Sequence, residues 1–412
     1  MTHSDDDSPP LWQFVPLAQY TRPPEPATEK MRRGIRAFWD RLKHPRNMMD
    51  EAIDQKSLQK MRGEDFNWIA PAPQWSEGIP ALDECLQDWL AYQGNFYPLK
   101  VVVAPPHSGV RQMIEGWAAT KKWRTIEPPD PREILAGKKG LHRDVHAHGD
   151  IPIVLSSLEK WYLRHHNGLE IMRELLDHLA SRQEHTLICC DSWAWAYLKK
   201  TVQADLAFPS PITLAAFHGQ SLSRWFGSLV RLDGETHCVF RHPKTEKVVL
   251  DTSDSYTHNE ENDRSDFLTQ TAASSRGIPG VAHALWRHSL RLGLEDAEAP
   301  QDREREASGR ESSTCPRNIR VIPWQKLDTP SVPKGDSRFA FLLHTLLLHD
   351  GVSTTLLPPL VQSLTHPLAE GLKELQASGM VDHQQDTWRV TPLGYPAARR
   401  YLLGEEYLVD DF

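Results

Sequence analysis

The chain has 412 residues and a mass of 47.0 kDa, which leaves room for two or three domains and excludes a single small one. Its 47 Lys and Arg against 55 Asp and Glu give a formal charge of −8, which argues against a protein that binds a polyanion over its whole surface. The mean hydropathy of −0.53 and the lack of a long apolar run predict a soluble chain without a membrane-spanning helix.

The first 74 residues are expected to lie outside the main core. Residues 1–29 are mainly polar and rich in proline, which predicts a disordered lead. No apolar segment follows a basic start, so we expect no secretory signal and a cytoplasmic location. Residues 30–74 are predicted to form N-terminal helices, because apolar side chains such as Ile35 and Leu42 recur at helical intervals and Pro45 divides the pattern.

Residues 75–208 alternate between helical segments and short apolar runs. The runs lie at 99–104, 151–155 and 185–190, and each leads into a helix-like stretch. Runs of this kind without a two-residue period are typical of parallel strands that are buried on both faces. The sequence therefore predicts a three-layer α/β core.

The first run passes into the next helix through a short loop that ends at Gly109. A strand, a loop and a helix in this order provide the setting of a phosphate-binding loop, in which backbone N–H groups face the anion. Aligned with G-x-x-x-x-G-K-[ST], the segment keeps Gly109 but has Ala104, Val110 and Arg111 in place of Gly, Lys and Ser/Thr. The lysine for the phosphates and the hydroxyl for Mg²⁺ are thus missing.

The second run lacks the acidic residues that would hold Mg²⁺ in a nucleotide hydrolase. Its strand ends in Ser156-Ser157, and Glu159 follows where a helix is expected to direct it away from the strand edge. The sequence therefore predicts no metal site and no catalytic residue here.

In these segments the chain resembles the AAA+ and STAND group of P-loop ATPases, over about residues 75–292. The similar segments are Ala104–Gly109 for the Walker A loop, Ile153–Lys160 for the Walker B strand, Leu187–Ser192 for the sensor-1 strand and Gly277–Arg287 for the lid helix with sensor 2. The resemblance implies a P-loop ATPase-like core over 75–208 and a lid over 209–292, with a hairpin insertion, that clamp ATP or ADP between them. The positions that it assigns to nucleotide binding are His107, Ser108, Gly109, Val110, Arg111, Asp191, Ser192 and Arg287.

A charged segment, residues 293–334, is predicted to be a linker to a C-terminal domain over 335–412. The apolar spacing there predicts three helices followed by a β-wing, which resembles a winged helix-turn-helix domain. From Ser337 to the C-terminus, five Lys and Arg stand against nine Asp and Glu. Because phosphate neutralisation supplies much of the affinity for DNA, this balance favours a protein contact.

Two smaller signals have an ordinary interpretation. The residues His146, His148 and Asp150 form an H-x-H-x-D string of the kind that holds zinc, but a solvated polar loop is the plainer interpretation. The adjacent Cys189 and Cys190 lie in an apolar run and are expected to be buried free thiols.

The sequence thus predicts a catalytically degenerate, ATPase-like regulatory or scaffold protein that acts through protein contacts and has no ATPase activity. Binding of ATP or ADP without hydrolysis and without a metal is part of this hypothesis. The alternative is a DNA-binding regulator that uses the winged helix together with the basic residues Arg32, Arg33 and Arg36.

Overall fold

The computed structural model describes residues 10–24, 58–61, 63–91, 97–138, 140, 145, 151–208, 210–230, 238–243, 245–252, 266–293, 317–334, 338–361 and 368–412. The chain divides into two compact units. Unit 1 is formed from Met1–Thr21, Gln74–Ala216 and Thr329–Phe412, and unit 2 from Arg22–Pro73 and Phe217–Asp328.

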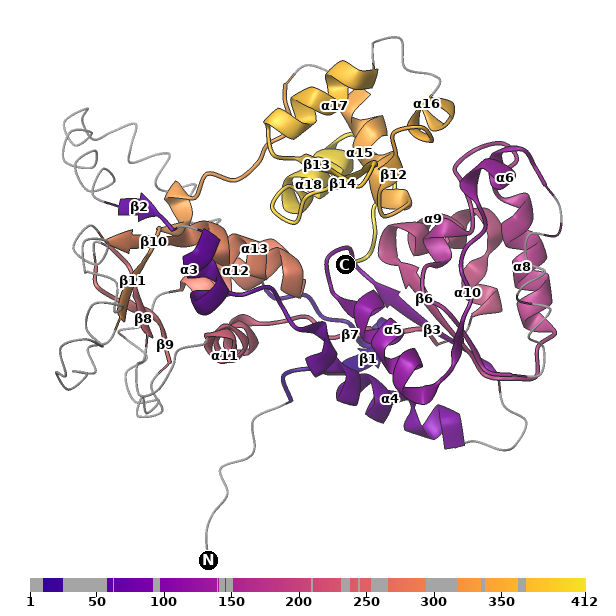
Figure 1. Cartoon of the computed structure of the whole chain (residues 1–412), viewed down its shortest axis with the longest axis horizontal. Coiled ribbons are helices and arrows are strands. Elements are labelled where there is room, and N and C mark those ends of the chain that lie inside the picture. Colours follow the sequence, from indigo (N-terminus) through magenta and orange to yellow (C-terminus); the bar gives the residue numbers. More distant parts are fainter. Residues whose placement is uncertain are drawn as a thin grey trace, which may run out of the picture. The chain divides into compact units, whose positions relative to one another are not determined.

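Unit 1 contains a six-stranded sheet that is mostly parallel (Figure 1). In spatial order its strands are β1 (Phe14–Pro16), β7 (Ile212–Leu214), β3 (Leu99–Ala104), β6 (Thr186–Asp191), β5 (Ile153–Leu155) and β4 (Arg124–Thr125). The three apolar runs seen in the sequence form the central strands β3, β6 and β5. The expected α/β core is confirmed, with a sheet that is mostly parallel and has the antiparallel strand β1 at one edge.

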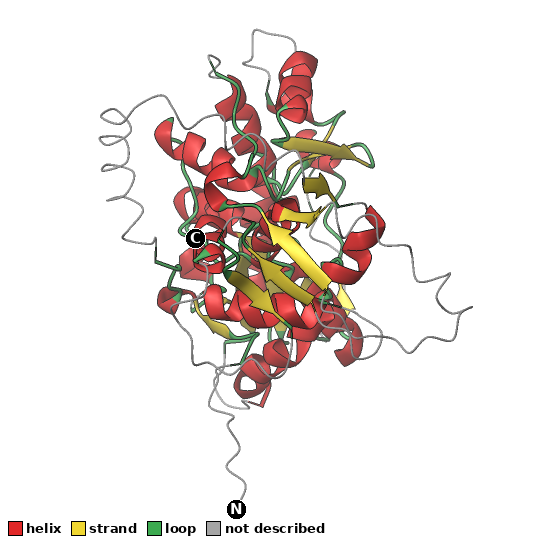
Figure 2. Ribbon diagram, turned by 90° about the vertical axis from the view of Figure 1, so that its left-hand side faces the viewer, coloured by secondary structure: helices red, strands yellow, loops and turns green. Residues whose placement is uncertain are grey.

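Helices cover both faces of this sheet, as its uniformly apolar strands require (Figures 1 and 2). They are α4 (Ile79–Ala91), α5 (Val110–Lys121), α6 (Pro131–Leu135), α8 (Glu170–Ala180), α9 (Ser192–Val202) and α10 (Ala204–Ala207). Val101 and Val103 of β3 pack with Leu175 of α8 and Leu198 of α9 in one buried cluster. The intervening Val102 faces the other way, toward the side on which α4 and α5 lie.

Part of the predicted disordered lead is a strand. β1 pairs antiparallel with β7, with Phe14 opposite Leu214, and a 3₁₀ turn, η1 (Leu17–Gln19), follows it. Trp12 and Phe14 are buried. A three-residue edge strand that ends in Pro16 is too short to show a period in the sequence, and proline is tolerated at such an edge.

The C-terminal segment of unit 1 has helices and a hairpin at the predicted places. The elements are α15 (Arg338–Leu348), β12 (Val352–Ser353), α16 (Leu357–Leu360), α17 (Leu368–Ala377), β13 (Val381–Gln384), β14 (Thr387–Val390) and α18 (Tyr395–Gly404). Strands β12, β14 and β13 form a small antiparallel sheet. Pro358 lies in the first turn of α16, where the missing N–H of proline has no cost.

Unit 2 contains a second sheet of five strands together with helices. The strands in spatial order are β2 (Leu58–Lys60), β10 (Leu290–Gly293), β11 (Arg317–Val321), β8 (Cys238–Arg241) and β9 (Val248–Asp251), and the helices are α3 (Gly63–Ile69), α11 (Gly219–Leu229), α12 (Phe267–Ser275) and α13 (Pro279–Ser289). Aromatic rings dominate its core, with Phe226 stacked on Trp286 at 5.1 Å between ring centroids. The predicted hairpin of β8 and β9 is confirmed.

Two segments of unit 2 differ from the sequence-based expectation. Leu58–Lys60 is a strand rather than part of a helix, and residues 30–57 of the predicted N-terminal helices lie outside the described residues. Arg317–Val321, expected within the linker 293–334, is a strand whose Ile319 and Val321 are buried. In the sequence, these two apolar residues are two positions apart, which is the spacing of one face of a strand. In the part of the chain that the structure describes, no helix has the length and apolar character to cross a membrane.

Candidate functional site

The carboxyl edge of β3 and β6 is where a ligand crevice is expected in this fold. The two strands are neighbours, with Ala104 opposite Asp191, but the helices that follow them, α5 and α9, lie on opposite faces of the sheet. In open α/β sheets such a reversal leaves room for a ligand beyond the ends of the two strands. The loop before α5 therefore lies at the position predicted for it.

The loop between β3 and α5 is a tight turn. His107 and Gly109 both have a left-handed backbone, with φ of 64° and 79°. A Cβ on Gly109 would lie 2.2 Å from the ring of Trp75, so only glycine fits there. Ala104, Ser108 and Val110 are buried, and the ring of His107 lies edge-on to Tyr395 of the C-terminal segment. The chain's own side chains thus cover this loop.

Arg111, in the first turn of α5, is neutralised by two carboxylates of the same chain. It forms an ion pair with Glu159 after β5, and its Nη1 lies 2.8 Å from Oδ2 of Asp350 in the C-terminal segment. Burial alone would lower the pKa of Arg111, but Glu159 and Asp350 outweigh it and raise that pKa. Burial likewise favours a raised pKa for Asp350, yet Arg111 and Lys160 hold it below its usual value. Asp350 is therefore ionised at neutral pH.

The prediction that Glu159 points away from the strand edge is wrong. After β5 the chain makes a single 3₁₀ turn, η3 (Leu158–Lys160), instead of a helix, and this turn directs the Glu159 carboxylate back toward β6. One oxygen accepts from Arg111 and the other accepts from the backbone N–H of Asp191 at 3.1 Å. Because Glu159 is fully buried and both of its oxygens are bonded to protein, it does not face a water site.

The two predicted sensor-1 residues have structural partners. Asp191 caps α9 by accepting the backbone N–H of Trp193 at 2.8 Å, and burial together with Asp350 and Glu159 raises its pKa well above the usual value. The hydroxyl of Ser192 donates to Oδ2 of Asp410 at 2.6 Å. Both side chains are engaged by the chain itself.

The C-terminal segment docks on the same edge through polar contacts. Nζ of Lys160 donates to the backbone carbonyls of His349, Asp350 and Gly351. The distance is 2.9 Å to the carbonyl of Asp350 and 3.0 Å to that of Gly351. Tyr162 donates to the carbonyl of Leu348 at 3.1 Å. These four successive carbonyls follow or end α15, whose C-terminal end carries a partial negative charge that a lysine complements.

The chain's last residues complete this contact. Asp410 accepts from Tyr395 and from Nε of Arg399 at 2.9 Å, and Arg399 also donates to its backbone carbonyl. Phe412 packs in the same buried cluster as β3 and α9. The tail thus holds the C-terminal segment to the core.

The structure brings the predicted residues of the loop and of β6 together at one edge, namely His107, Ser108, Gly109, Val110, Arg111, Asp191 and Ser192. Arg287 lies in unit 2, where its guanidinium packs over the ring of Phe66 at 4.6 Å. Sequence reasoning missed Lys160, Asp350 and Asp410. A useful signal for Asp350 was its place before Gly351 at the end of a strongly apolar helix.

Chemically, this edge holds an arginine that is paired with two carboxylates of the chain. Among the described residues there is no group of three or more His, Cys, Asp or Glu side chains that could hold a metal ion. The string His146, His148 and Asp150 lies outside the described residues. Cys189 and Cys190 are buried free thiols, and burial raises the pKa of both.

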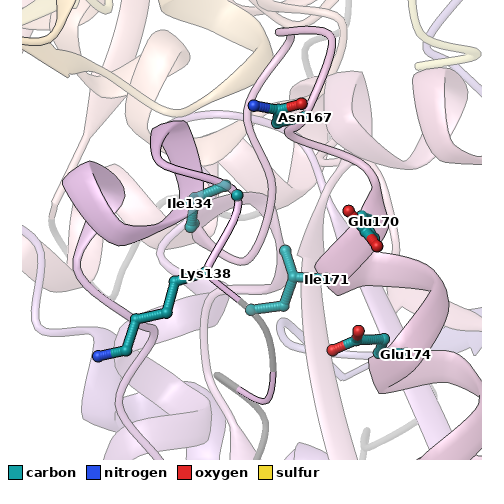
Figure 3. Close-up of a pocket in the computed structure, with 7 residues that line it drawn as sticks. Ile134, Lys138, Asn167, Glu170, Ile171 and Glu174 are labelled. Carbon is teal, nitrogen blue, oxygen red and sulfur yellow. The ribbon is translucent and has the colours of Figure 1, made fainter.

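Two cavities in unit 1 have linings that do not include the loop before α5. The first, of about 10 Å³, has the size of one water molecule, and Figure 3 shows Lys138 pointing away from the carboxylates of Glu170 and Glu174 that line it. The second, of about 370 Å³, is lined partly by Tyr20 and Trp195. The first is too small for a nucleotide.

No family model and no curated protein sequence matches the chain. Among solved structures it is similar to the ORC2 protein of Aeropyrum pernix in ADPNP–ADP complexes, with 14% identity, 84% of this chain and 99% of that chain covered, and a TM-score of 0.35. It is also similar to a Walker-type ATPase of Pyrococcus abyssi (12% identity, 82% and 98% covered, TM-score 0.31) and to Cdc6p from Pyrobaculum aerophilum (14%, 82% and 95%, TM-score 0.29). These TM-scores are too low to show a common fold.

Proposed function

We propose that the chain is a degenerate relative of the AAA+ and STAND P-loop ATPases that does not hydrolyse ATP and acts as a regulatory scaffold through protein contacts. One observation carries the proposal: the only cation in the first turn of α5, Arg111, is held by Glu159 and Asp350. In an active P-loop enzyme, cations at this place neutralise the phosphates and an acidic residue polarises water. Here one cation faces two carboxylates of the same chain, so its positive charge is already compensated.

The missing groups support the same proposal. Val110 and Arg111 stand where the lysine and the Mg²⁺-binding hydroxyl are needed, and the strand β5 is followed by Ser156 and Ser157. Phosphoryl transfer relies on the positioning of charge around the transferred group rather than on covalent chemistry by the protein. Among the described residues of this edge nothing replaces the metal ligands, and the cation Arg111 is already paired with Glu159 and Asp350.

Release of phosphate from ATP in the presence of Mg²⁺ tests the proposal. We expect the full chain and its Glu159→Gln variant to release phosphate at the rate of buffer alone. Gln is nearly the same size as Glu and keeps an oxygen for the N–H of Asp191, so it serves as the matched control. A rate for the full chain that exceeds buffer and falls in Glu159→Gln would contradict the proposal.

The surface of the C-terminal segment favours protein over DNA as the partner. On α17 the exposed charged side chains are Glu370, Lys373 and Glu374, and the hairpin between β13 and β14 exposes Asp386. A recognition helix with this balance repels phosphates. We therefore expect no binding of a labelled duplex at physiological salt. Tight binding that weakens steeply as salt is raised would favour the DNA-binding alternative.

A further inference from the structure

The turn after α15 is fixed to the core along its whole length. Lys160 reaches the carbonyls of three consecutive residues, His349 to Gly351, and Tyr162 reaches the carbonyl before them. His349 is buried, its Nε2 accepts the backbone N–H of Arg164, and its Nδ1 lies 3.4 Å from the carbonyl of Glu159. The turn after α15 is thus held by the buried Glu159 and by residues that follow it in the sequence.

The backbone of this turn is also specialised. Asp350 and Gly351 both have a left-handed backbone, with φ of 43° and 88°. A Cβ on Gly351 would lie 2.4 Å from Cγ of Arg389. A left-handed conformation is unfavourable for Asp unless the surroundings hold it in place. The contacts with Lys160 supply that hold, and they aim the Asp350 carboxylate at Arg111.

Asp350 brings a negative charge to the place where the loop before α5 would meet a phosphoryl group. Its Oδ2 lies 2.8 Å from Nη1 of Arg111. Within the described part of the chain, Nε of Arg111 and Nε2 of His107 are buried and have no hydrogen-bond partner. The Nε–H of Arg111 is thus a donor that an incoming anion could use. The charge of Asp350 opposes such an anion as long as the turn stays in place.

We propose that the turn His349–Gly351 is an intrachain latch: the Asp350 carboxylate holds the place of a diphosphate group beside Arg111, and a diphosphate binds there when the turn leaves. This inference rests on the proposed function, because it assumes a phosphate-binding loop before α5. The diphosphate binds only to those molecules in which the turn is open. Its apparent dissociation constant is therefore the intrinsic constant divided by the open fraction. Removal of the Asp350 charge therefore strengthens diphosphate binding.

Calorimetric titration of the full chain without Mg²⁺ tests the latch, with inorganic pyrophosphate and ADP as separate probes. We expect Asp350→Asn to bind pyrophosphate about tenfold tighter than the unmodified chain, or more. Glu370→Gln removes one exposed carboxylate from the same segment and is expected to leave the affinity unchanged. An equal gain for ADP assigns recognition to the diphosphate, and a larger gain adds a contribution from the adenosine. Equal affinities of all three proteins for pyrophosphate, or an equal gain in Glu370→Gln, would overturn the latch.

A second variant keeps every charge and covers the case in which Asp350→Asn does not fold. Tyr162→Phe removes only the hydroxyl that holds the Leu348 carbonyl. Amide hydrogen exchange over residues 346–351 is expected to become faster in this variant, with α8 unchanged, and pyrophosphate binding is expected to strengthen. Unchanged exchange in the turn would overturn the latch. ATP hydrolysis by the unmodified chain would contradict the proposed function, whereas these affinity and exchange ratios decide on the latch alone.

Discussion

Replacing Arg111 by Met should destabilise unit 1 strongly, because it leaves a buried carboxylate without its cation. The side chain of Glu159 is 0% exposed, whereas that of Arg111 is 25% exposed. Breaking a fully buried ion pair by removing one partner costs about 3–5 kcal/mol of unfolding free energy. Because Arg111 is partly exposed, we expect a loss of about 3 kcal/mol, at the lower end of that range.

Urea unfolding, followed by tryptophan fluorescence, measures this loss. The double variant Arg111→Met with Glu159→Gln removes the uncompensated charge while keeping an acceptor for the N–H of Asp191, so it should recover at least half of the stability. Arg173→Met, which removes an exposed arginine of α8, should change the unfolding free energy by about 0.5 kcal/mol or less. A cost below about 1 kcal/mol for Arg111→Met, or no recovery in the double variant, would refute the reasoning.

Three further predictions concern the same edge. Asp410→Ala should lower the free energy of unfolding by about 3–5 kcal/mol because it leaves the buried Arg399 without its carboxylate. The neighbouring Asp411→Ala, at a carboxylate that is 74% exposed, should lower it by less than about 1 kcal/mol. Equal losses on urea unfolding would contradict this prediction. Gly109→Ala should lower stability by more than about 1 kcal/mol, while Gly404→Ala, where nothing lies within 4 Å, should not destabilise the fold; thermal unfolding of both checks it. Burial and Lys160 lower the pKa of His349 to about 3, so this side chain takes up a proton more readily in the unfolded chain. The free energy of unfolding therefore falls as the pH drops below about 6.5, by about 2 kcal/mol between pH 6.5 and 5. The variant His349→Gln should remove that part of the pH dependence.

The central strands could be predicted from the sequence because they are buried on both faces. Apolar runs such as 99–104 leave no doubt about burial, and the glycine at 109 marks the turn that follows. The edge strand β1 gave no such signal, because three residues next to prolines do not establish a period. The strand at 317–321 was hidden by the charged segment before it.

The partners of the site residues could not be predicted from the sequence, since they depend on how distant segments pack. Lys160 and His349 are 189 positions apart, and no local pattern relates them. The orientation of Glu159 follows from the single 3₁₀ turn that the chain makes after β5, at the end of which Trp161 is buried. That Val110 and Arg111, rather than a lysine and a hydroxyl, follow Gly109 is in contrast visible in the sequence alone.

Single-turnover hydrolysis of ATP by the Asp350→Asn variant, with Mg²⁺ present, tests most directly whether this edge lacks the chemistry of phosphoryl transfer. In this variant the carboxylate that opposes phosphate under the proposed latch is gone, so its repulsion cannot account for a slow reaction. We predict that γ-phosphate is released no faster than in buffer. Faster release that disappears when Glu159→Gln is added would show a working catalytic site and contradict the account.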